Sequence, residues 1–122
     1  MKNTRNGKTY HCPFDAAIDV IGGKWKMGII WHLGENVMRF NELQKVLPGV
    51  SAKTLTNQLR ELEEDGILLR TAYPEVPLRV EYRITSFGKT LIPVMQALCD
   101  WGGRYLDTET GDQCLTKAEQ KI

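Results

Sequence analysis

The stretch FNELQKVLPGVSAKTLTNQLRELEEDGIL, residues 40–68, contains two helical segments joined by a tight turn. In the turn, Pro48 ends the first helix, and Gly49 can take the positive φ that a sharp reversal requires. Ser51 supplies a side-chain oxygen that caps the second helix, and Gly66 ends that helix. One apolar stripe along the second helix is formed by Leu55, Leu59 and Leu62. The stretch therefore predicts a helix-turn-helix.

Charge is uneven along the second predicted helix. Its first two turns are basic and polar, whereas its last turn, residues 61–65, is acidic and therefore unfavourable at the negative end of the helix dipole. A helix that enters the DNA major groove with its N-terminal half would meet phosphates and base edges with the basic half. For this helix taken alone, an ordinary amphipathic helix with a solvated polar face is the alternative. The DNA-contact candidates are Ser51, Lys53, Thr54, Thr56, Asn57 and Arg60.

Composition limits what kind of protein this is. A chain of 122 residues with 42% hydrophobic and 25% charged residues is expected to be one soluble globular domain. The net charge is only +1, with +3 on residues 1–26 and −2 on residues 107–122. Any surface that attracts DNA must therefore be a local patch.

Several other functions find no support in the sequence. No apolar run approaches the roughly 20 residues of a membrane span, and the three widely spaced cysteines favour a reducing cytoplasm. The histidines and cysteines lack metal-ligand spacing, and His32 is expected in the core or at a dimer face. Because no positioned base or oxyanion site accompanies Cys12, we expect neither an enzyme nor a cofactor.

Upstream of residue 40, the sequence predicts a mobile arm over residues 1–11 and then two helices. The first starts at Pro13, which suits the first helical position, places Cys12 at the N-cap and ends at Ile21. The second runs from Lys24 to about Leu33 and is apolar nearly all round, so it should form the buried centre of the domain. Residues 37–39 are expected to form one bridge of a small sheet.

A β-hairpin is predicted directly after the helix-turn-helix. Residues 68–72 and 79–85 are candidate strands, the second with strict alternation, and the intervening loop contains two prolines. A hairpin in this position is typical of a wing, whose tip lies along the DNA backbone or minor groove. Arg79 is the candidate phosphate contact of the wing, with Arg70 as a further one. The alternative is a surface hairpin with ordinary charges.

The last predicted helix runs from a cap at Thr85 or Ser86 to about Leu106. Its apolar stripe exceeds what a small core can cover, so we expect the same helix of a second copy to pack on it. The alternative is that the stripe packs entirely within its own chain. The dimer-interface candidates are Leu91, Val94, Met95, Leu98, Trp101 and Tyr105.

A series of motifs follows one order along residues 12 to about 106: Cys12-Pro13, Ile21-Gly22-Gly23-Lys24-Trp25, Arg39-Phe40-Asn41-Glu42-Leu43, Leu47-Pro48-Gly49-Val50-Ser51, the segment from Leu55 to Gly66, Arg79-Val80-Glu81-Tyr82, Ser86-Phe87-Gly88-Lys89 and Trp101-Gly102. In this combination the chain resembles the HxlR-type family of bacterial winged helix-turn-helix regulators, relatives of the MarR group. The resemblance implies a mainly α fold with a small β-wing, in which a three-helix core carries a hairpin and is flanked by N- and C-terminal dimerisation helices. It also implies a homodimeric transcription factor that reads a pseudo-palindromic operator in double-stranded DNA. We expect the domain to span residues 12–106, between an arm over residues 1–11 and a flexible tail over residues 107–122.

Two details of the resemblance bear on regulation. Lys53 and Leu78 stand where relatives often carry other residues, so the resemblance does not specify the operator sequence. In a subset of the family, the cysteine before this proline senses electrophiles or oxidants, which makes Cys12 a sensor candidate and Cys114 a candidate resolving partner. A purely structural Cys12 is the alternative. At the level of function, the alternative to a DNA-binding regulator is a winged helix that binds proteins and no DNA.

Overall fold

The structure, a computed structural model, describes residues 4, 5 and 7–107 and confirms the helix-turn-helix. The first helix of the motif is α3 (Phe40–Val46), and the second is α4 (Ala52–Glu64). Gly49 has a φ of 90°, as the sharp turn requires. Ser51 caps α4, because its Oγ accepts a hydrogen bond from the backbone N–H of Thr54 at 3.0 Å.

Two helices precede the motif and provide the centre of the core. Helix α1 (Pro13–Ile21) has the predicted bounds, with Cys12 at its N-cap. Helix α2 (Lys26–Leu33) begins two residues later than predicted, because Gly23 has a φ of 94° and Trp25 takes the N-cap position. The burial of α2 on several sides confirms it as the centre of the domain.

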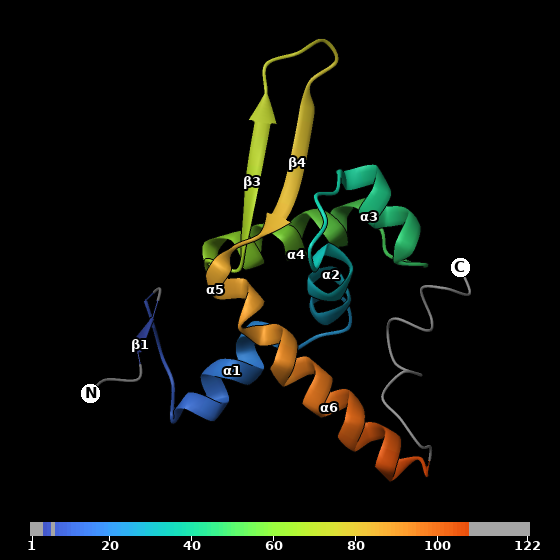
Figure 1. Cartoon of the computed structure of the whole chain (residues 1–122). Coiled ribbons are helices and arrows are strands. Elements are labelled where there is room, and N and C mark those ends of the chain that lie inside the picture. The colour runs from blue at the N-terminus through green and yellow to red at the C-terminus, as the bar shows by residue number, and fades with distance from the viewer. Residues whose placement is uncertain (1–3, 6, 108–122) are drawn as a thin grey trace.

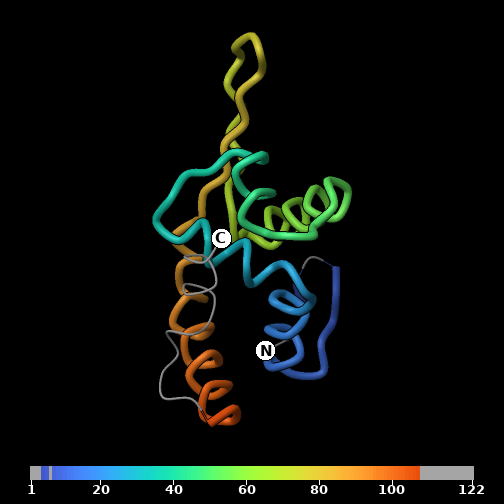
Figure 2. The backbone as a smooth tube through the Cα atoms, turned by 90° about the vertical axis from the view of Figure 1, so that its right-hand side faces the viewer, coloured from blue at the N-terminus to red at the C-terminus, as the bar shows by residue number. Residues whose placement is uncertain are grey.

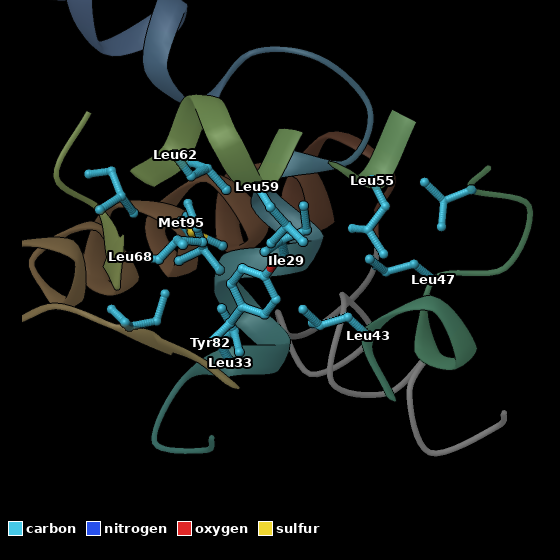
Figure 3. Packing of buried hydrophobic residues seen from close by; sticks show 14 residues of the cluster. Ile29, Leu33, Leu43, Leu47, Leu55, Leu59, Leu62, Leu68, Tyr82 and Met95 are labelled. Carbon is cyan, nitrogen blue, oxygen red and sulfur yellow. The ribbon is translucent and has the colours of Figure 1, made fainter. Parts of the chain in front are cut away.

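The leucine stripe of α4 packs onto this centre. Leu55, Leu59 and Leu62 are buried and lie over α2, as Figure 3 shows. Tyr82 and Met95 close the same cluster from the hairpin and from the last helix. The outer face of α4 is therefore the part of this helix that remains available for a partner.

The hairpin consists of β3 (Leu68–Tyr73) and β4 (Arg79–Ile84), paired antiparallel with Leu68 opposite Ile84 and Tyr73 opposite Arg79. It forms the predicted wing, which projects from the body in both views (Figures 1 and 2). Met38 makes the single predicted bridge to the base of the wing, at Tyr82. This bridge ties the wing to the segment between α2 and α3.

The last predicted helix is divided in two. Helix α5 (Ser86–Lys89) is capped by Thr85, whose Oγ1 accepts from the N–H of Gly88 at 2.9 Å, and α6 (Leu91–Tyr105) follows. From the sequence alone, one continuous helix is expected here. The break has a physical cause, because Pro93 cannot donate a backbone hydrogen bond to the carbonyl of residue 89 and its ring crowds that carbonyl.

The first described residues form a short hairpin that the sequence did not predict. Strands β1 (Thr4–Arg5) and β2 (Lys8–Thr9) pair antiparallel, and we call the described residues of segment 4–10 the N-terminal strap. The strap is held to α1 through Asp19, which accepts from the Tyr10 hydroxyl at 2.7 Å and from Lys8 Nζ at 3.2 Å. These two donors, Tyr10 first, hold the pKa of Asp19 below its usual value.

The wing and the terminal helices project in opposite directions. Figures 1 and 2 show the wing on one side of the helix-turn-helix and both α1 and α6 on the other. Within the described part of the chain, none of the helices has the length and apolar character that crossing a membrane requires.

Candidate nucleic-acid interface

The first turn of α4 is organised by its own hydroxyl groups. Ser51 Oγ accepts from the Thr54 N–H and donates to Thr54 Oγ1 at 3.0 Å, so both side chains belong to the helix cap. The Thr56 hydroxyl donates to the Ala52 carbonyl at 2.8 Å. Of the six predicted contact residues, these three are thus already engaged with the helix itself, although Ser51 and Thr56 remain exposed.

The other three predicted contact residues share the exposed face of α4. Lys53, Asn57 and Arg60 follow one another at helical spacing, and all three are exposed. Arg60 Nη1 donates to Asn57 Oδ1 at 3.5 Å, which places the guanidinium beside the amide. Neither Lys53 nor Arg60 forms an ion pair with any residue that the structure describes, so both charges face solvent unneutralised. Arginine and lysine side chains commonly contact phosphates, and an asparagine amide can pair with a base edge.

A groove separates this face from the wing. It has a volume of about 380 Å³ and brings Arg60 of α4 together with Arg70 of β3. Glu63 is the only carboxylate among its lining residues, so the groove carries a net positive charge. From the sequence, Arg70 is only a secondary candidate, because the strand register is needed to place it on the α4 side of the hairpin, opposite Tyr82. The groove lining consists of Thr56, Leu59, Arg60, Glu63, Arg70 and Tyr82.

Arg79 lies in a different environment from Arg70. Its guanidinium is paired with Glu75 at 2.9 Å and with Glu81 at 2.6 Å, and it lies 3.8 Å from the centroid of the Tyr73 ring. The hydrogen bond from Arg79 holds the pKa of Glu75 below its usual value, and Glu75 in turn raises the pKa of Arg79. In this structure, two carboxylates therefore pair with the guanidinium that was expected to contact phosphate.

The acidic last turn of α4 receives cations from other parts of the chain. Glu61 pairs with Lys26 of α2 at 2.6 Å, and the Lys26 side chain is only 7% exposed. Arg5 of the strap donates to the Asp65 carbonyl at 3.2 Å and lies over the Phe87 ring. Cations at a helix C-terminus are stabilised by its dipole. Lys26 and Arg5 therefore compensate for the unfavourable acidic charges that the sequence places at this end of α4. Local sequence spacing carries no signal for either contact, because the partners are 35 and 60 residues apart.

The predicted dimer stripe divides into two sets. Val94, Leu98, Trp101 and Tyr105 are exposed on α6, and the Trp101 and Tyr105 rings stack with centroids 5.6 Å apart. Met95 is 2% exposed and belongs to the core, and Leu91 packs partly against it. Met95 is therefore a correction to the predicted interface, because its side chain is already buried within its own chain.

The remaining predicted sites have mixed outcomes. Cys12 is a free, half-buried thiol at the N-cap of α1, and its side chain makes no capping hydrogen bond. Cys114 lies outside the described residues. His32 is buried in α2 and belongs to the core. Among the described residues, no group of three or more histidine, cysteine or acidic side chains is placed to hold a metal ion.

Comparisons with known proteins bear on the family and the fold. The family model for HxlR-like helix-turn-helix proteins matches residues 20–110. The chain is 43% identical to the HTH-type transcriptional regulator YdeP of Bacillus subtilis strain 168, with both chains covered completely. Among solved structures, the redox regulator HypR in its reduced form is 44% identical, with a TM-score of 0.74 over 79% of this chain and 95% of that one. Diamide-treated YodB from B. subtilis is 33% identical, with a TM-score of 0.67 over 80% of this chain and 96% of that one.

Proposed function

The chain belongs to the HxlR-like helix-turn-helix family of transcriptional regulators, and on that premise we propose that it is a dimeric, sequence-specific DNA-binding regulator that acts in the cytoplasm. One observation carries the proposal: the exposed face of α4 presents Lys53, Asn57 and Arg60 beside a cationic groove that leads to the wing. Phosphates and base edges are the partners that this combination of side chains recognises.

Docking follows from the geometry of α4. Its N-terminal half enters the major groove, while the last turn, tied to Lys26 and Arg5, stays outside. Two copies related by a two-fold axis place their recognition helices about 34 Å apart, one turn of B-DNA. The operator is accordingly pseudo-palindromic.

The exposed face of α6 is the surface through which a second copy binds. Val94, Leu98, Trp101 and Tyr105 are each between 47% and 75% exposed, an apolar strip that water solvates poorly. Helix α6, which carries the strip, lies on the side of the molecule away from the wing (Figure 2), so a two-fold contact there leaves both recognition helices accessible. Leu98→Glu should convert the dimer to a monomer in analytical ultracentrifugation, whereas Glu35→Gln, which changes a surface charge elsewhere, should not.

Substitution of Asn57 tests whether the exposed face of α4 contacts the operator bases. Asn57→Ala should cost roughly 1–3 kcal/mol at selected operator base pairs and leave binding to random DNA nearly unchanged. The measurement is a salt-titrated binding assay on DNA that flanks the gene of this protein, with random DNA of equal length. If Asn57→Ala binds both DNAs as the wild type does, this face of α4 is not the reader.

The same assay separates the second candidate function, a winged helix that binds only proteins. A protein-interaction module would show no affinity for either DNA at low salt, where the counterion-release term is largest. Retained, salt-dependent binding that favours the flanking DNA rules that alternative out.

A redox- or electrophile-responsive role for Cys12 is the finer part of the proposal. Two observations favour it: the thiol is free at the N-cap of α1, and structures of a redox regulator and of a diamide-treated regulator superpose well on this chain. A thiol in this position faces the positive end of the α1 dipole. Oxidation by diamide joins two thiols in a disulfide and reduces diamide by two electrons and two protons, with Cys114 as the proposed second thiol.

The test compares wild type with Cys12→Ser before and after treatment with diamide or a quinone. Treatment should lower the operator affinity of the wild type and leave Cys12→Ser unchanged. The loss caused by diamide should be reversed by dithiothreitol. An equal loss in both proteins would show that Cys12 is not the sensor.

A further inference from the structure

The wing contains an arginine, Arg79, whose three guanidinium nitrogens all donate hydrogen bonds within the hairpin. Arg79 Nε donates to both Glu75 oxygens at 3.2 and 3.3 Å, Nη2 donates to Glu75 Oε2 at 2.9 Å, and Nη1 donates to Glu81 Oε2 at 2.6 Å. The flat face of the group stacks on Tyr73, the strand residue directly opposite. All three nitrogens and one face are therefore engaged, and the side chain is 26% exposed.

This environment is unsuitable for binding phosphate. A phosphate that approached Arg79 would meet Glu75 and Glu81, and the three groups together carry a net charge of −1. To bind DNA through this guanidinium, the protein would have to break at least one charge-assisted, bidentate pair. Arg70 and Arg83 of the same hairpin are exposed and form no ion pair with any described residue, so they are the available cations.

The three contacts join the two strands and the loop of the wing. Tyr73 ends β3, Arg79 starts β4, and Glu75 belongs to the loop between them. The loop is otherwise held by few contacts, since the Val76 side chain is completely exposed and Leu78 is 62% exposed. The ion pair thus closes the wing at the point where its ladder ends.

We propose that Arg79 is a positioning residue, which fixes the wing loop through Glu75, Glu81 and Tyr73, and that Arg70 makes the phosphate contact of this hairpin. The inference rests on the proposed DNA-binding function. We call the contacts of Arg79 with Glu75, Glu81 and Tyr73 the clamp. A loop that is ordered before binding loses less conformational entropy when it binds DNA, so the clamp increases affinity without contacting the DNA.

The decisive variant is Glu75→Gln, because the two roles of Arg79 predict opposite signs. If Arg79 positions the loop, loss of the ion pair weakens operator binding about three- to tenfold. If Arg79 contacts phosphate, removal of the neighbouring negative charge frees the guanidinium and tightens binding. Glu35→Gln is the matched control, since it removes one carboxylate on another part of the surface and should leave affinity unchanged.

Salt dependence distinguishes the two arginines. Arg79→Gln should weaken binding as much as Glu75→Gln, with an unchanged slope of log affinity against log salt, and the double variant should be no weaker than either single one. Arg70→Gln should reduce that slope by about 0.9, the contribution of one phosphate contact. Tighter binding by Glu75→Gln, or a reduced slope for Arg79→Gln, would overturn the assignment.

A measurement without DNA separates failure of this inference from failure of the proposed function. In hydrogen-exchange experiments on the free protein, Glu75→Gln and Arg79→Gln should speed exchange at residues 73–80 and leave α4 unchanged. Unchanged exchange in the wing would refute the clamp even if the wild type bound no DNA. Conversely, faster exchange in these variants, together with no DNA binding by the wild type, would refute the proposed function but still support the role of Arg79 in ordering the loop.

Discussion

The two halves of α4 share one helix and one leucine stripe but differ on their outer faces. In the first part of α4, up to Arg60, neither Lys53 nor Arg60 has an ion-pair partner among the described residues, and both are exposed. In the C-terminal half, Glu61 is bound by Lys26, and the Asp65 carbonyl accepts from Arg5. A helix can thus serve two purposes when one end is anchored by distant residues and the other is kept free for a ligand.

The two parts of α4 should differ only on the outer face of the helix and not in the core, and the first prediction tests this. Leu55→Ala in the free half and Leu62→Ala in the anchored half should each lower the free energy of unfolding by about 2–5 kcal/mol, because both side chains are fully buried. Urea denaturation provides the measurement. If one variant were nearly neutral, the anchored and free halves would differ in the core as well.

Breaking the anchor should have a smaller effect, on stability alone. Glu61→Gln leaves the buried Lys26 ammonium without its carboxylate, which should cost about 1–3 kcal/mol. Glu63→Gln, two residues along the same helix, removes an exposed charge that pairs with no described residue and should change stability by less than about 0.5 kcal/mol. Equal melting temperatures for the two variants would mean that the pair does not anchor α4.

Loss of a contact made by the N-terminal strap should lower the free energy of unfolding by the smallest amount. Arg5→Ala removes one hydrogen bond to the end of α4 and one cation–π contact with Phe87, which together should cost about 0.5–1 kcal/mol. Lys53→Ala, in contrast, should leave the melting temperature unchanged and should reduce the salt dependence of DNA binding. Reduced DNA affinity for Arg5→Ala at low temperature, where both proteins are folded, would contradict the division of α4 into two halves.

Local signals were sufficient to predict the parts of the fold that local interactions determine. The positive φ at Gly49, the cap at Ser51 and the leucine stripe depend on residues a few positions apart, and the structure confirms each of them. Alternation in residues 79–85 likewise predicted β4, with Tyr82 on its buried side.

Long-range pairing accounts for most of what the sequence analysis missed. The contact of Arg5 with Asp65 and the pairing of Lys26 with Glu61 join segments that no periodicity connects. The pairing of Arg79 with Glu75 is local by contrast, since the two residues are four positions apart, but it depends on the path of the loop between β3 and β4. The division between α5 and α6 is the exception, since Pro93 was visible in the sequence and could have predicted it.

The exposed aromatic pair on α6 provides an optical test of the proposed dimer. Trp101 is 63% exposed, and two further tryptophans, Trp25 and Trp31, pack partly against the core. If a second copy covers Trp101, only this indole moves from water into an apolar environment as the protein concentration rises. The emission maximum should then shift to shorter wavelength with concentration in the wild type and remain fixed in Trp101→Phe, so monomer and dimer can be followed without any label.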